Sequence, residues 1–117
     1  MSRRLEIRPR RGLPVVYVDI DGTMTHSRRR GWGRPKAQVI LKVRDLIARG
    51  YVVYVWTGGG AEYARRFCAR HGLAGVAGYL PKPNVIVDDN PNLLPARRLG
   101  RLSPEEFAEE EFPWEEA

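Results

Sequence analysis

The chain has little cysteine, little histidine and no long apolar run. Its 117 residues include two histidines and one cysteine, Cys68, which cannot form an internal disulfide. No apolar run approaches the roughly 20 residues that cross a membrane. The arginine-rich start also contains no apolar signal core. We therefore expect a cytoplasmic protein in a reducing compartment, without a membrane partner.

Acidic residues are scarce over most of the chain. Residues 1–103 contain all 20 lysines and arginines but only seven of the 14 acids, which leaves a formal charge of +13. The other seven acids are glutamates between Glu105 and Glu116. A body this basic favours phosphorylated partners, with nucleic acid as the obvious candidate, although solubility alone would also account for the charge.

The charge pattern divides the chain into a basic arm (1–14), a central domain (15–102) and an acidic tail (103–117). In the tail, Ser103 and Glu106 have the spacing of a capping box that opens a short helix. Two arrangements of the tail remain open. It is either solvated, or it folds onto the basic body or onto a neighbouring subunit of a homo-oligomer.

Strand and helix patterns alternate along the central domain. Apolar runs predict strands over residues 15–20, 51–56, 76–80 and 84–87. Helical spacing of apolar residues predicts helices over residues 35–49 and 61–71. This alternation is typical of an α/β fold, a Rossmann-like three-layer sandwich with a mostly parallel central sheet and helices on both faces. In such folds ligands bind beyond the carboxyl ends of the strands.

The first strand ends in two acids. Asp19 and Asp21 are two residues apart and should point to the same side, because strand side chains alternate. Gly22 then allows a turn without a Cβ penalty. The alternative interpretation is an Asp-Gly turn that closes a hairpin.

The sequence Asp-x-Asp-Gly-Thr after a hydrophobic strand resembles the first motif of the haloacid dehalogenase superfamily of phosphohydrolases. The resemblance covers roughly residues 15–91, and the later motifs follow in order. Thr57 with Gly58 matches the second motif, Lys82 matches the third, and Asp88 with Asp89 matches the fourth. Taken singly, Thr57 could be a helix N-cap and Lys82 a solvated lysine between two prolines.

The resemblance implies a phosphatase that works through an aspartyl-phosphate. Asp19 would be the nucleophile and Asp21 the general acid and base, while Lys82 would steady both the nucleophile and the phosphate. Thr57 and Gly58 would bind the phosphoryl oxygens. Transfer of the phosphoryl group to an alcohol other than water remains open.

Carboxylates that converge at one sheet edge repel one another, and a bound cation relieves the repulsion. The metal ligands that we predict are Asp19, Asp21, Asp88 and Asp89. Because these ligands are all oxygens and no His or Cys cluster lies nearby, Mg²⁺ is expected rather than zinc.

Members of this superfamily usually select substrates with an inserted cap domain. The gaps at residues 24–34 and 58–80 are too short for one, so we expect a capless protein with an open site. The loop bearing Arg28, Arg29, Arg30 and Trp32 could grip phosphates and stack on a base. We therefore predict a nucleotide or nucleic-acid phosphate end as substrate, with a sugar phosphate as an alternative.

A second class of function also fits the composition. It is a non-catalytic, basic nucleic-acid-binding module in which the acids are structural. Other reactive residues are less promising, since Cys68 falls on the apolar face of a helix and His26 lies in a loop. Gly58 to Gly60 lack the Lys and Ser/Thr that follow in a P-loop, which excludes that type of ATPase.

Overall fold

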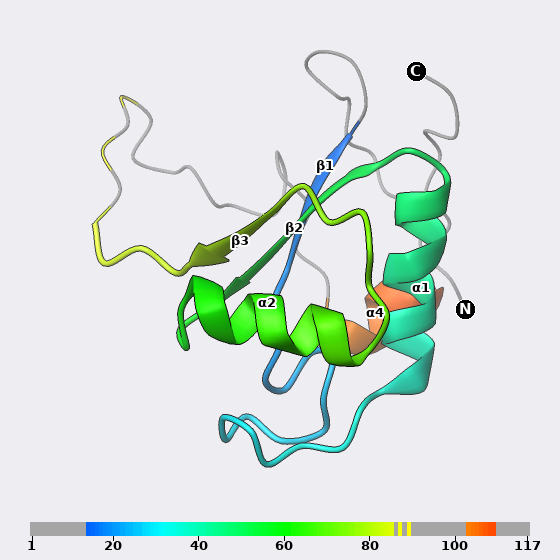
Figure 1. The fold of residues 1–117 in the computed structure, drawn as a ribbon, viewed down its shortest axis with the longest axis horizontal. Helices are drawn as coiled ribbons and strands as arrows, with labels where there is room; N and C mark the ends of the chain where they lie inside the picture. Colours follow the sequence, from blue (N-terminus) through cyan, green and yellow to red (C-terminus); the bar gives the residue numbers. More distant parts are fainter. Residues whose placement is uncertain (1–13, 86, 88, 90–102, 110–117) are drawn as a thin grey trace.

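A computed structural model of the chain describes residues 14–85, 87, 89 and 103–109 (Figure 1). The described elements, in chain order, are β1 (Val15–Val18), α1 (Ala37–Ala48), β2 (Val52–Thr57), α2 (Ala61–Arg70), β3 (Gly78–Pro81) and α4 (Pro104–Glu109). None of the helices within these ranges has the length and apolar character needed to cross a membrane. The α/β alternation predicted from the sequence is confirmed.

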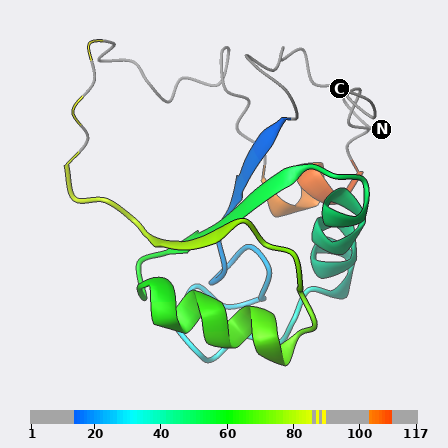
Figure 2. The same cartoon turned by 45° about the horizontal axis from the view of Figure 1, so that its top comes forward.

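The three strands form one parallel sheet in the order β1-β2-β3. Val15 is opposite Val52 in the first pair, and Tyr54 is opposite Gly78 in the second. Parallel neighbours need crossover connections, which α1 and α2 provide. Both crossovers step in the same direction across the sheet, so right-handed connections place both helices on one face. Figure 2 shows α1 and α2 on the same side of the strands.

The core lies between α1, α2 and the face of the sheet that these helices cover. Along β2, the inward residues Val53, Val55 and Thr57 are buried, whereas the alternate residues are only partly buried. Val43 and Leu46 of α1 are fully buried against this layer, as is Ala64 of α2. The apolar face of the sheet and the apolar faces of the two helices, which follow from strand and helix periodicity, thus pack against each other.

The opposite face of the sheet has no helix over it among the described residues. On β1, Val15 is 57% exposed and Tyr17 is 50% exposed. The Tyr17 ring lies 5.3 Å from the Tyr54 ring and 5.2 Å from the Trp56 ring. The predicted third layer is therefore not found in the described part of the chain, because both described crossovers run to the same face.

The prediction of a buried strand over 84–87 is wrong for the residues that the structure describes there. Asn84, Val85 and Val87 belong to no strand, and Val85 and Val87 are 77% and 93% exposed. Only two residues, Lys82 and Pro83, separate the end of β3 from the predicted strand, which is too few for a crossover to another parallel strand.

Helix α4 packs against α1. Phe107 is buried in the core cluster, and Lys36, just before α1, forms an ion pair of 2.8 Å with Glu105. The predicted capping box is confirmed: the Ser103 N–H donates to Glu106 Oε1, and the Glu106 N–H donates to Ser103 Oγ. The described part of the tail, residues 103–109, thus folds onto the basic body.

Candidate active site at the carboxyl ends of the strands

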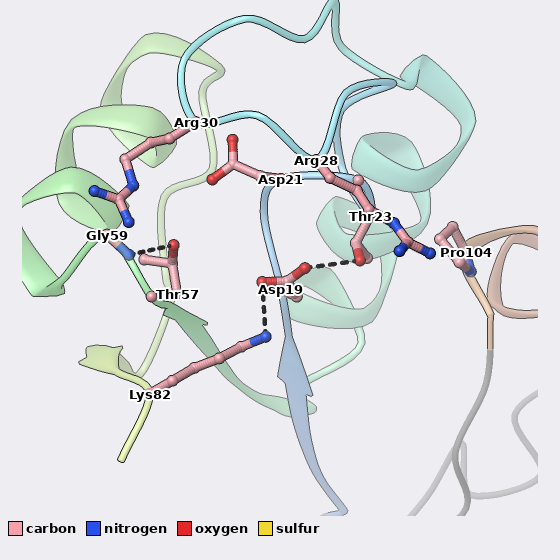
Figure 3. Close-up of a pocket in the computed structure, with 11 residues that line it drawn as sticks. Asp19, Asp21, Thr23, Arg28, Arg30, Thr57, Gly59, Lys82 and Pro104 are labelled. Carbon is pink, nitrogen blue, oxygen red and sulfur yellow. Dashed lines mark hydrogen bonds and ion pairs between the residues drawn. The ribbon is translucent and has the colours of Figure 1, made fainter. Parts of the chain in front are cut away.

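The carboxyl ends of the three strands meet at one cavity of about 530 Å³. Its lining consists of Asp19, Asp21, Gly22, Thr23, Arg28, Arg30, Thr57, Gly58, Gly59, Lys82 and Pro104. Asp19 follows β1, Thr57 ends β2 and Lys82 follows β3. These three residues come from parts of the sequence up to 63 positions apart, and the parallel sheet brings them together (Figure 3).

Asp19 is held at both carboxylate oxygens. Lys82 Nζ lies 3.2 Å from Asp19 Oδ1, and the Thr23 hydroxyl donates to Asp19 Oδ2 over 3.0 Å. The Asp19 side chain keeps 27% of its surface exposed. The carboxylate therefore has a fixed orientation and remains accessible from the cavity.

The sheet register places Lys82. The Lys82 N–H donates to the carbonyl of Thr57 over 3.1 Å, which continues the pairing of β2 with β3 by one residue. Its ammonium group lies 5.5 Å from the centre of the Trp56 ring, within range of a cation–π contact. Backbone pairing and Trp56 thus both direct Lys82 toward Asp19.

A tight turn, rather than strand alternation, positions Asp21. The strand ends at Val18, and the carbonyl of Ile20 accepts hydrogen bonds from the N–H groups of Thr23, Met24 and Thr25. Gly22 has φ of +82°, a conformation that L side chains rarely adopt. The predicted strand over 15–20 is therefore two residues too long, but Asp19 and Asp21 both line the cavity.

Tyr63 is a site residue that the sequence analysis missed. Its hydroxyl donates to Asp21 Oδ1 over 2.8 Å and accepts the Gly31 N–H over 3.0 Å. Burial raises the pKa of Tyr63, and the hydrogen bond to Asp21 acts in the same direction, so the phenol stays protonated at neutral pH. The sequence feature that could have indicated this role is a tyrosine in the first turn of the helix that follows the Thr57–Gly60 loop.

Thr57 is 1% exposed, and its Oγ accepts the Gly59 N–H over 3.0 Å. This bond folds the loop between β2 and α2 over the end of the strand. The N-cap of α2 is Gly60, which makes no side-chain capping bond, so the alternative of Thr57 as the N-cap is wrong. Gly58 is exposed and lines the cavity.

The arginine-rich loop is a small hairpin. Thr25 and Pro35 form an antiparallel bridge at its base, and the His26 N–H donates to the carbonyl of Arg34. Of the four predicted substrate contacts, Arg28 and Arg30 line the cavity. Arg29 and Trp32 do not line it; they stack on each other at 4.4 Å, and Trp32 is 70% exposed.

Two of the four predicted metal ligands lie together. Asp19 and Asp21 supply the oxygen donors that Mg²⁺ prefers, and this ion commonly binds through one or two carboxylates, so the residues present fit it. The residues that the structure describes contain no group of three or more His, Cys, Asp or Glu arranged for a metal. Asp89 is exposed and does not line the cavity, and Asp88 lies outside the described residues.

The remaining reactive side chains lie elsewhere. Cys68 is 1% exposed, and burial raises its pKa to about 11, which leaves it an inert core thiol. The centre of the His71 ring lies 4.4 Å from that of Phe67. Burial lowers the pKa of His71, and the positive charge of Arg70 adds a smaller effect in the same direction.

Comparison of the chain with protein-family models, with curated proteins and with solved structures gave no match.

Proposed function

We propose that this protein is a Mg²⁺-dependent phosphomonoester hydrolase of the haloacid dehalogenase type. The observation that carries the proposal is the 3.2 Å ion pair between Asp19 and Lys82, in the same cavity as Thr57 and Asp21. A fixed, accessible carboxylate beside a cation and a hydroxyl is an arrangement that suits nucleophilic attack on a phosphate ester.

In the first half of the reaction, an oxygen of Asp19 attacks phosphorus and the bond to the ester oxygen breaks. Asp21 donates its proton to the departing oxygen, so the product leaves as an alcohol. Lys82 and the loop of Thr57 and Gly58 bind the phosphoryl oxygens and offset their negative charge.

In the second half, Asp21 removes a proton from water, and the resulting hydroxide attacks the phosphorus of the aspartyl-phosphate. The bond to Asp19 breaks, which releases inorganic phosphate and restores both carboxyl groups. Asp19 and Asp21 would hold Mg²⁺, whose positive charge stabilises the phosphoryl oxygens when it is bound.

The test is phosphate release from an aryl phosphate, with and without Mg²⁺, by the native protein and by Asp19→Asn. We expect turnover that requires Mg²⁺ and falls at least a thousandfold in the variant, because the amide cannot act as the nucleophile. The matched control is Asp45→Asn, the same chemical change on α1, where Asp45 pairs with Arg49 and does not line the cavity. Full activity of Asp19→Asn would show that the proposed nucleophile is wrong.

A second candidate is a nucleic-acid-binding module without catalysis. The stacked pair of Arg29 and Trp32 favours it, because an exposed aromatic ring beside a cation suits a nucleic-acid base. Tight, salt-sensitive binding of an oligonucleotide by a protein without any phosphate release would support this candidate over the first.

A further inference from the structure

The cavity is lined by two cations besides Lys82. Lys82 is paired with Asp19, whereas the guanidinium groups of Arg28 and Arg30 have no carboxylate partner among the described residues. Unpaired guanidinium groups that line a cavity attract anions and bind phosphate oxygens in a bidentate manner.

The two arginines enter the cavity on different sides. Figure 3 shows Arg30 reaching toward Gly59 and Thr57, while Arg28 lies beside Thr23 and Pro104. They are two residues apart in the loop, and Arg29 between them stacks on Trp32 outside the cavity. The loop thus directs Arg28 and Arg30 into the cavity and Arg29 away from it.

Two glycines leave the space that these side chains occupy. A Cβ atom at Gly22 would lie 2.7 Å from Cγ of Arg28, and one at Gly59 would lie 2.9 Å from Nε of Arg30. Both distances are shorter than ordinary contacts. A larger residue at Gly22 would therefore displace Arg28, and one at Gly59 would displace both Arg30 and Tyr63, whose Cδ2 would lie 2.7 Å away. The glycines and the arginines therefore fit each other as one surface.

The loop is also attached to the site. The Gly31 N–H donates to the Tyr63 hydroxyl, and the Trp32 N–H donates to the carbonyl of Arg29. These bonds fix the backbone on either side of Arg30. A preorganised loop loses less conformational entropy on binding than a free one, which favours recognition of an anion.

We propose that Arg28 and Arg30, which reach the cavity from different sides, bind a further phosphate group of the substrate, so that the site selects substrates that carry another phosphate group besides the monoester. This inference rests on the proposed function, in which Asp19, Thr57 and Lys82 bind the phosphoryl group to be hydrolysed. A cavity of about 530 Å³ falls within the range of small-molecule sites and has room for more than a lone phosphate. Two phosphate groups in one molecule are found both at the phosphorylated end of a nucleic-acid strand and in a nucleoside bisphosphate.

The experiment compares kcat/KM for phosphate release from a nucleoside 5′-monophosphate, a nucleoside 3′,5′-bisphosphate, a hexose phosphate and short oligonucleotides phosphorylated at the 5′ or the 3′ end. We expect the second phosphate to raise kcat/KM of the native protein at least tenfold, with a gain that decreases as salt increases. A preference for the bisphosphate would identify a free nucleotide as the source of the second phosphate, and a preference for a phosphorylated oligonucleotide would identify a nucleic-acid end.

The double variant Arg28→Gln/Arg30→Gln should lose most of this gain. Arg34→Gln is the matched control, because Arg34 is an exposed arginine of the same loop that does not line the cavity. Equal kcat/KM for mono- and bisphosphate in the native protein, or an undiminished gain in the double variant, would overturn the proposal.

Calorimetric titration with the same mono- and bisphosphate separates this inference from the proposed function. Absence of turnover, together with tighter bisphosphate binding that depends on Arg28 and Arg30, would refute the hydrolase and retain the second phosphate site. Turnover without any preference for the second phosphate would retain the hydrolase and refute the site.

Discussion

Tyr63 connects the carboxylate of Asp21 to the arginine-rich loop. Its hydroxyl contacts Asp21 and Gly31, and its ring packs against the core. Because the tyrosine donates to one oxygen of Asp21, it limits the rotation of the carboxyl group that we propose as acid and base. Tyr63 is thus a positioning residue in the proposed reaction.

Replacing Tyr63 with Phe should lower kcat roughly tenfold, since a hydrogen bond to a charged group contributes about 1.5 kcal/mol or more. KM for an aryl phosphate, which carries a single phosphate group, should change less than twofold, because none of the hydrogen bonds of the Tyr63 hydroxyl is to Thr57, Gly58 or Lys82. Steady-state kinetics on an aryl phosphate measure both values. Tyr54→Phe, the same change on the outer face of the sheet, is the control and should behave like the native protein. An unchanged kcat in Tyr63→Phe would remove the positioning role.

At the scale of elements, α4 contributes one residue to the lining of the site although it is distant in sequence. Pro104 at its first position lines the cavity, and Phe107 one turn later is 7% exposed against the core. In the ion pair of Lys36 with Glu105, the Lys36 side chain is 18% exposed but the Glu105 side chain is 73% exposed, so solvent screens the pair. Burial of Phe107 rather than this ion pair should therefore attach the helix.

Phe107→Ala should lower the free energy of unfolding by about 3 kcal/mol, since the substitution removes a buried ring and leaves a cavity. Lys36→Gln, which breaks the exposed ion pair, should cost less than about 1 kcal/mol. Urea unfolding followed by circular dichroism gives both values. If Lys36→Gln proved the more costly change, the ion pair would be the main attachment of α4.

For the molecule as a whole, β2 is the central element. It pairs with β1 on one edge and β3 on the other, and α1 and α2 both pack on it. Its inward residues Val53 and Val55 are fully buried. Opening β2 would therefore disrupt every layer of the described structure at once.

Native-state hydrogen exchange should show this order of stability. We expect the β2 amides to exchange on the order of a hundredfold more slowly than those of the six-residue helix α4, because they open only in global unfolding. Exchange followed by NMR resolves the individual amides. Similar rates in β2 and α4 would show that the two elements unfold as one unit.

Much of the fold was determined by local pattern. Helical spacing of apolar residues identified α1 and α2, and continuous apolar runs identified the three strands within two residues at each end. The roles of Asp19, Asp21, Thr57 and Lys82 were hypotheses from motif order, and all four residues line one cavity. Local signals located these residues at strand ends and turns, because such features are encoded by neighbouring residues, whereas the parallel sheet brought them to one cavity.

Only the tertiary structure decided the rest. It placed both crossover helices on one face, left Asn84, Val85 and Val87 outside the sheet, and separated Arg28 and Arg30 from Arg29. It also brought Tyr63 to Asp21, a contact between residues 42 positions apart. These results depend on the direction of each crossover and on packing between distant segments, and neither is contained in the periodicity of a single segment.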